Sequence, residues 1–113
     1  MRLVEGRHAV AMYLSVHRYR NHRPNMVASY EIIAAELSRW AAGQSIEFNV
    51  KFWGLTADIR RYIIVADWPD EVSAMAMAVH LDMHLDVETE LTRLIDDLRA
   101  VAEKSGHEFG GIE

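Results

Sequence analysis

The stretch from Arg61 to Val79 constrains the fold more than any other part of the chain. Its apolar run over residues 61–66 is typical of a strand, and Pro69 in an acidic turn interrupts that run. An Ala- and Met-rich segment follows, and Asp67 is placed to cap it as a helix. A strand that leads directly into a helix indicates a mixed α and β fold.

A similar strand-then-helix unit opens the chain. Residues 8–19 alternate between two sets of side chains, which predicts a strand: Met12, Leu14 and Val16 against Tyr13, Ser15 and His17. Asn25 is then predicted to cap a helix whose apolar residues recur at helical spacing: Met26, Tyr30, Ile33, Leu37 and Trp40. Gly43 is predicted to end that helix in a left-handed conformation.

Two further strands are predicted, over residues 46–53 and 86–94. In the first, one face is expected to carry Ile46, Phe48, Val50 and Phe52, and the other Glu47, Asn49, Lys51 and Trp53. The helix after Asp67 is expected to bury Val72, Met75, Ala76, Val79 and Met83. A short closing helix is predicted over residues 95–104. Flexible ends are expected at residues 1–7 and 106–113.

This element order, βαββαβ, predicts one α+β domain spanning residues 1–113. Right-handed crossovers place both main helices on one face of a four-stranded antiparallel sheet, which is the ferredoxin-like arrangement. The predicted alternation leaves Tyr13, Ser15, His17 and Trp53 on the face that the helices do not cover. A second copy of the chain is expected to cover that face and to enclose a ligand cleft.

Composition narrows the function classes. The 113 residues contain no cysteine, which excludes a thiol nucleophile, a disulfide and a Cys-type zinc site. The net charge of −5 argues against nucleic-acid binding, which needs a cationic surface. Because no apolar run resembles a signal peptide or a membrane span, we expect a cytoplasmic protein without a membrane partner.

Three segments, residues 12–19, 62–71 and 87–91, resemble the dimeric α+β barrel superfamily, and the GYD-domain proteins most closely. The turn from Asp67 to Asp70 and the Ala-rich helix after it carry this resemblance, although the Gly-Tyr-Asp signature is absent. The superfamily includes cofactor-free monooxygenases, isomerases, haem-handling enzymes and non-catalytic ligand binders. The resemblance therefore implies a homodimer, or a higher homo-oligomer, that binds a small apolar or anionic molecule.

The predicted uncovered face supplies the candidate site residues. As catalytic residues we expect His17, acting as a general base, and Tyr13 beside it. Ser15, Asn49 and Trp53 are expected to bind the substrate, with the Trp53 ring stacking on it. The alternative is that His17 is hydrogen-bonded and inert at a dimer interface.

A basic loop follows the first strand. Arg18 and Arg20, with His22 and Arg23 nearby, are expected to bind an anionic group of the substrate. The alternatives are a solvated loop or a contact with the acidic end of another subunit. The edge-strand charges (Glu47, Lys51, Glu88 and Glu90) are expected either to act as acid/base groups or to keep the sheet edges soluble.

No metal or other cofactor is predicted. The weak alternative is a metal site at His80 and His84, whose spacing places both imidazoles on one face of a helix. The leading hypothesis is a small-molecule-binding protein and, if it is an enzyme, a cofactor-independent monooxygenase or isomerase. The competing hypothesis is a non-catalytic accessory or assembly subunit that binds a protein partner.

Overall fold

The computed structural model describes residues 11–94 and 103–106, and its element order is the predicted βαββαβ. The elements are β1 (Ala11–Tyr19), α2 (Met26–Gly43), β2 (Asn49–Leu55), β3 (Tyr62–Trp68), α3 (Glu71–His84) and β4 (Val87–Leu94). The closing helix predicted over residues 95–104 lies outside the described residues except for its last two. The predicted flexible ends also lie outside them, apart from Gly106.

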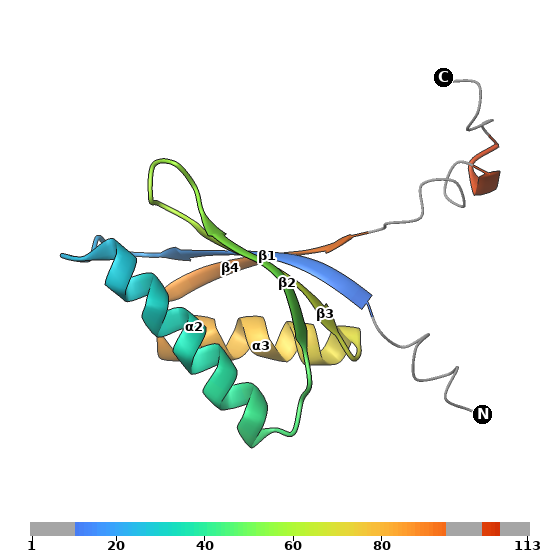
Figure 1. The fold of residues 1–113 in the computed structure, drawn as a ribbon, viewed down its shortest axis with the longest axis horizontal. Helices are drawn as coiled ribbons and strands as arrows, with labels where there is room; N and C mark the ends of the chain where they lie inside the picture. Colours follow the sequence, from blue (N-terminus) through green and yellow to red (C-terminus); the bar gives the residue numbers. More distant parts are fainter. Residues whose placement is uncertain (1–10, 95–102, 107–113) are drawn as a thin grey trace.

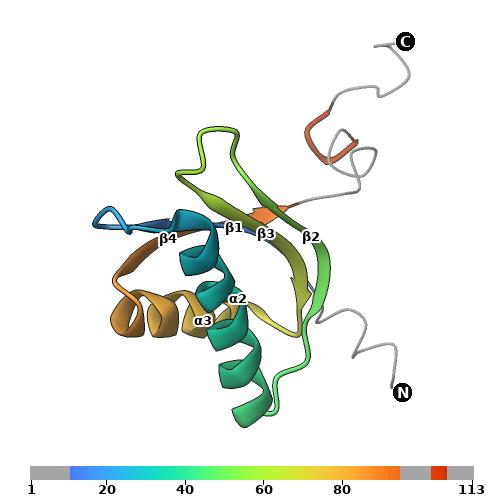
Figure 2. The same cartoon turned by 60° about the vertical axis from the view of Figure 1, so that its left-hand side comes forward.

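The four strands form one antiparallel sheet in the order β2-β3-β1-β4. Helices α2 and α3 lie on the same side of that sheet (Figure 1), so the ferredoxin-like arrangement is confirmed. The view in Figure 2 shows the two helices stacked against one sheet face and the loop between β2 and β3 projecting beyond it. As predicted, β2 and β4 are the edge strands.

The predicted orientation of β1 was wrong. Tyr13, Ser15 and His17 lie buried under the helices, whereas Met12, Leu14 and Val16 lie half-buried on the uncovered face. Both alternating sets suit burial, but the set with larger rings fills the space under the helices. In that layer Tyr13 packs in one cluster with Tyr19, Tyr30, Tyr62 and Trp68.

Strand β2 contains a bulge, which overturns its predicted alternation. Val50 pairs with Ala66, but Phe52 already pairs with Val65, so Lys51 is an extra residue between them. Beyond the bulge, Trp53 pairs with Ile64, whose side chain is buried under the helices. Trp53 therefore lies on the helix side of the sheet and Phe52 on the uncovered side, the reverse of the prediction.

Helix α2 is the helix that the sequence pattern describes correctly. Asn25 caps it, with its Oδ1 accepting from the Ala28 N–H at 3.1 Å. Its buried residues are Tyr30, Ile33, Leu37 and Ala41. The first three belong to the predicted helical spacing.

Helix α3 begins later than predicted and buries a different face. Strand β3 continues to Trp68, and Asp70 is the cap, accepting from the Ser73 N–H at 2.7 Å. Because α3 is apolar around most of its circumference, its pattern does not select one buried stripe. The buried residues are Ala74, Met77 and Leu81, whereas four residues of the predicted stripe are exposed, namely Val72, Met75, Val79 and Met83.

Within the described residues, no helix combines the length and the apolar character that crossing a membrane requires.

The end of α2 provides a test of backbone conformation. Gly43 is helical and a Cβ there would meet nothing within 4 Å, whereas Ser45 has a φ of 57°. We predict that Gly43→Ala and Ser45→Gly each raise the free energy of unfolding by about 0.5 kcal/mol, measured by urea denaturation. If Gly43 instead took the predicted left-handed conformation, Gly43→Ala would lower the free energy of unfolding.

Candidate functional site

Three polar side chains form a hydrogen-bonded chain between the sheet and the helices. His17 lies between Tyr62 on β3 and Thr89 on β4. Its Nε2 is 2.8 Å from Ser15 Oγ, and its Nδ1 is 2.9 Å from Thr89 Oγ1. Ser15 Oγ donates to the Ile64 carbonyl at 3.4 Å. These contacts favour the tautomer with a proton on Nε2, because every hydrogen then has one acceptor.

This arrangement makes His17 a structural residue. It is fully buried, and burial lowers the pKa of its imidazole from 6.5 to about 4, so the ring is neutral at pH 7. Thr89 occupies the nitrogen lone pair that a general base would use. The predicted pocket of Tyr13, His17 and Trp53 on the uncovered face is therefore not formed, because those residues lie on the helix side of the sheet.

The other predicted substrate-binding residues of that pocket lie apart. Ser15 belongs to the buried chain, and Trp53 lies near the edge of the sheet with its ring centroid 5.8 Å from that of Tyr62. Asn49 begins β2 and lines a separate cleft. The bulge in β2, which the sequence alternation does not show, accounts for the position of Trp53, whereas the position of Ser15 follows from the orientation of β1.

The predicted anion-binding arginines are paired within their own chain. Arg18 forms an ion pair with Glu88, and Arg20 lies 3.7 Å from Asp86 and 3.8 Å from Glu88. Arg23 extends the network, with its guanidinium 3.9 Å from Asp86. The acidic partners of the basic loop are therefore supplied by the turn before β4 and by β4 itself. The predicted binding of a substrate anion by Arg18 and Arg20 would have to compete with these ion pairs, and it stays a prediction.

His80 and His84 lie on one face of α3, with ring centroids 4.3 Å apart. His80 Nε2 is 2.6 Å from Glu36 Oε2, and the His80 ring stacks on Trp40 at 5.3 Å. In the described part of the chain, no group of three His, Cys, Asp or Glu residues is arranged to hold a metal ion. The pair instead joins α3 to α2 through Glu36.

Glu36 is the centre of this junction between the helices. Hydrogen bonds from Arg39 and His80 lower the pKa of its carboxyl group from 4.5 to about 2. The Glu36 and His80 side chains are 18% and 15% exposed, whereas Arg39 is 69% exposed, so the contact between Glu36 and His80 is the one shielded from solvent. The junction holds the middle of α2 against α3.

A cleft of about 1160 Å³ opens where α2 ends and the chain returns to β2. Figure 1 shows α2 running obliquely to the sheet, so that its C-terminal end is joined to β2 by an extended link. The cleft is lined by Ser38, Ala41 and Ala42 of α2, by residues 45–49, and by Asp67, Trp68 and Pro69.

The chemistry of the cleft lining combines an aromatic pair with polar groups. Phe48 and Trp68 stack with centroids 4.7 Å apart and an interplanar angle of 9°. Asn49, Ser38 and Ser45 add neutral hydrogen-bonding groups, and Glu47 and Asp67 add carboxylates. Lys51 Nζ lies 3.4 Å from Asp67 Oδ2. None of the lining residues is basic.

The predictions identified only Asn49 among the polar residues of this cleft as a binding residue. Phe48 was predicted as a strand residue, and Trp68 as part of a turn. Pro69 was the one sequence signal for this cleft. Proline ends a strand, and binding residues often lie where a strand ends and a loop begins. The contact between Phe48 and Trp68 joins positions 20 residues apart in the sequence.

Comparison with known proteins found no matching family model, no matching curated protein and no matching solved structure.

The pKa of His17 predicts acid sensitivity. Because the folded state has the lower pKa, the unfolded chain binds a proton first, and stability falls as pH drops from 6.5 to about 4. The loss is about 3 kcal/mol, measured by urea denaturation across this range. We predict that His17→Gln removes most of this dependence, whereas His22→Gln, at an exposed position, keeps it. An unchanged profile in His17→Gln contradicts the burial of a neutral ring.

The lowered pKa of Glu36 predicts a second loss of stability, at lower pH than that of His17. Its folded pKa of about 2 lies below the unfolded value of 4.5, so its contribution is complete above pH 4.5 and is lost as pH falls towards 2. We predict that Glu36→Gln lowers the melting temperature at pH 7 and converges with the wild type near pH 2. Glu31→Gln, on the exposed side of α2, is the control and leaves the melting curve unchanged. A constant difference at every pH argues against the ion-pair junction.

Proposed function

We propose that the protein is a binding module for a small, mainly apolar molecule that carries a neutral or cationic polar end. The observation that supports this most directly is an open cleft lined by the half-buried Phe48 ring and by neutral hydrogen-bonding groups, with the Trp68 ring, 1% exposed, stacked against Phe48. Ligand sites in proteins commonly combine aromatic walls with a few polar groups in this way. A volume of about 1160 Å³ accommodates a molecule of several rings.

The charges around the cleft support a neutral or cationic ligand over the anionic one that the sequence resemblance implies. Glu47 and Asp67 are the charged lining residues, and both are acidic. Lys51 compensates Asp67 at 3.4 Å, whereas Glu47 is exposed and forms no ion pair with a described residue. An ammonium group near Glu47 gains from this field, and a carboxylate loses.

The proposal is for binding without turnover. A monooxygenase or isomerase of the predicted kind relies on His17 as a base, and His17 lies sealed in the core with both ring nitrogens engaged. The proposed ligand site uses the α2 end of the sheet instead, where His17 is not a lining residue.

Two probes with the same ring and opposite charge test the proposal: 2-naphthylmethylamine and 2-naphthoate. Binding is followed by amide and indole N–H shifts in NMR titrations of the full chain. We predict saturable shifts at Asn49 and Trp68, with the amine binding at least tenfold more tightly than the acid. Ala42→Trp, which fills the cleft, weakens the amine at least tenfold, whereas Ala35→Trp, at an exposed position of α2 outside the lining, leaves it unchanged.

The alternative outcomes separate the hypotheses. Equal binding of the two probes rejects the charge preference. Shifts that are insensitive to Ala42→Trp reject this cleft as the site. If neither probe shifts Asn49 or Trp68, the small-molecule proposal is overturned, and the accessory-subunit hypothesis, in which the chain binds a protein partner, takes its place.

A further inference from the structure

The two edge strands of the sheet carry different kinds of side chain. β4 has three charged residues, Glu88, Glu90 and Arg93, and all three are exposed. Charges of this kind keep a sheet edge from pairing with another strand. β2 has one charged residue, Lys51, whose Nζ lies 3.4 Å from Asp67 Oδ2. The edge at β2 is therefore guarded by fewer charges than the edge at β4.

Apolar side chains line the edge at β2 instead. Trp53 and Leu55 are 37% and 39% exposed on the helix side of the sheet, and Phe52 is 53% exposed on the uncovered side. The Phe52 ring lies over Gly54, since a Cβ at Gly54 would clash with it. Both sides of this edge thus offer apolar surface to a strand that lies beside it.

The backbone of β2 directs hydrogen-bonding groups away from the sheet at two of these residues. The Thr56 N–H donates to the Arg61 carbonyl at 3.0 Å, so these residues form a hydrogen-bonded pair across the ladder. Because such pairs alternate in an antiparallel ladder, Leu55 and Trp53 point their N–H and C=O groups to the free edge. An extended chain is the partner that satisfies such a row of alternating donors and acceptors.

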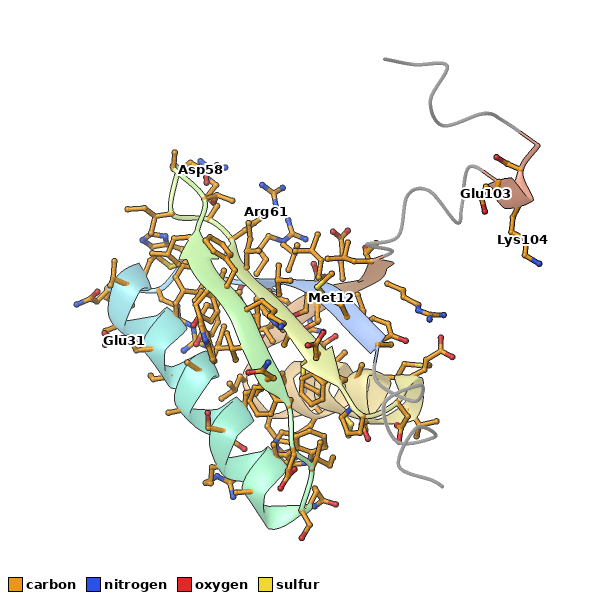
Figure 3. The ribbon with its side chains drawn as sticks, turned by 45° about the vertical axis from the view of Figure 1, so that its right-hand side comes forward. Met12, Glu31, Asp58, Arg61, Glu103 and Lys104 are labelled. Atoms are coloured by element: carbon orange, nitrogen blue, oxygen red, sulfur yellow. The ribbon has the colours of Figure 1, made fainter. Side chains whose placement is uncertain are left out.

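The charges at the two ends of β2 have opposite signs. Glu47, just before the strand, lines the cleft and forms no ion pair with a described residue. Beyond the other end, residues 56–61 have a net charge of +1, from Asp58, Arg60 and Arg61. Neither guanidinium forms an ion pair with a described residue. Figure 3 shows Asp58 and Arg61 on the hairpin, far from the C-terminal end of α2 where the cleft opens.

We infer that the ligand of the cleft is the first residue of an extended peptide, and that the following residues add a strand to the free edge of β2. This inference rests on the proposed function, because the cleft takes the apolar first side chain and places the terminal ammonium near Glu47. The peptide then runs parallel to β2, and an acidic residue at its end reaches Arg60 and Arg61. The opposite direction places the ammonium beside the two arginines and the acidic residue beside Glu47.

The geometry of β2 sets the length and the pattern of the peptide. The eight residues from Phe48 to Leu55 include Lys51, which is extra in the pairing, so a regular strand of seven residues covers the same length. Phe48 stacks on the buried Trp68 and therefore shares the helix side with Leu55. Alternate peptide residues, starting with the first, lie on that side. We expect apolar residues at the first, third and fifth positions and an acidic residue at the seventh.

Matched peptides test the inference, with NMR titration of the full chain as the readout. The probe is Phe-Ser-Val-Thr-Leu-Ser-Glu amide with a free N-terminus. We expect saturable shifts at Asn49, Trp53 and Leu55, and amide hydrogen exchange at Trp53 and Leu55 that is at least tenfold slower at saturation. The N-acetylated peptide and the reversed sequence, Glu-Ser-Leu-Thr-Val-Ser-Phe amide, each bind at least tenfold more weakly.

Variants of the edge separate backbone pairing from side-chain contact. Leu55→Pro removes the outward N–H and weakens the peptide at least tenfold relative to Leu55→Ala, which keeps that N–H. The double variant Arg60→Glu/Arg61→Glu binds the probe at least tenfold more weakly and prefers the same peptide with a C-terminal Lys. None of these residues lines the cleft, so each variant binds 2-naphthylmethylamine as the wild type does, which also shows that it is folded.

The remaining outcomes distinguish this inference from the proposed function. If 2-naphthylmethylamine binds but the peptide binds no more tightly than phenylalanine amide, the added strand is overturned and the ligand cleft stands. Equal binding of the peptide to Leu55→Pro and Leu55→Ala overturns the backbone pairing. Equal binding of the reversed sequence overturns the parallel direction. If the peptide protects Trp53 and Leu55 but is insensitive to Ala42→Trp and to N-acetylation, the placement of its first residue in the cleft is overturned.

Discussion

The hydrogen-bonded chain from Thr89 through His17 to Ser15 allows the ring-bearing side of β1 to lie under the helices, and the rest of the structure depends on that orientation. A buried imidazole and a buried hydroxyl are tolerated only when their hydrogen bonds are satisfied. Thr89 and the Ile64 carbonyl satisfy them from the strands on either side of β1. A shift of one residue in the pairing of β1 would turn Ser15 and His17 to the uncovered face and bury Met12, Leu14 and Val16 instead.

This orientation also separates the uncovered face from the cleft. With the rings of Tyr13 and Tyr62 beneath the helices, the uncovered face keeps aliphatic side chains, the exposed Phe52 ring, and charges at one end. The cleft at Phe48 and Trp68 lies at the C-terminal end of α2, beside the edge strand β2. The proposed ligand site therefore lies apart from the uncovered apolar face of the same sheet.

The sequence predicted the element order and the edge strands, because strand alternation and helix caps are local signals. It also predicted the buried face of α2, where Tyr30, Ile33 and Leu37 stand opposite polar residues. It did not predict the orientation of β1, since alternation yields two sets of side chains without saying which is inside. The deciding partner, Thr89, lies 72 residues from His17. In α3 the choice failed for a related reason, because Val79 and Met77 suit burial equally well.

The candidate site was predicted less well than the fold. Arg18 and Arg20 were recognised as a cationic group, but their pairing with Asp86 and Glu88 is a consequence of how β4 meets β1. Asn49 was assigned a binding role, and it lines a cleft to which helix α2, the start of β2 and the residues expected to form a turn all contribute. Contacts of this kind arise only after distant segments pack, so residue spacing does not reveal them.

The extra residue at Lys51 changes the alternation of β2 along the sequence without changing its pairing with β3. Losing this residue would restore regular pleating and leave Trp53 and Leu55 opposite Ile64 and Tyr62, on the same side of the sheet as before. Asn49 and the cleft, which precede the bulge, would keep their pairing with β3. Homologous chains that lack this residue would therefore share the cleft and the side on which Trp53 lies, and would differ in the local bend and twist of this edge strand.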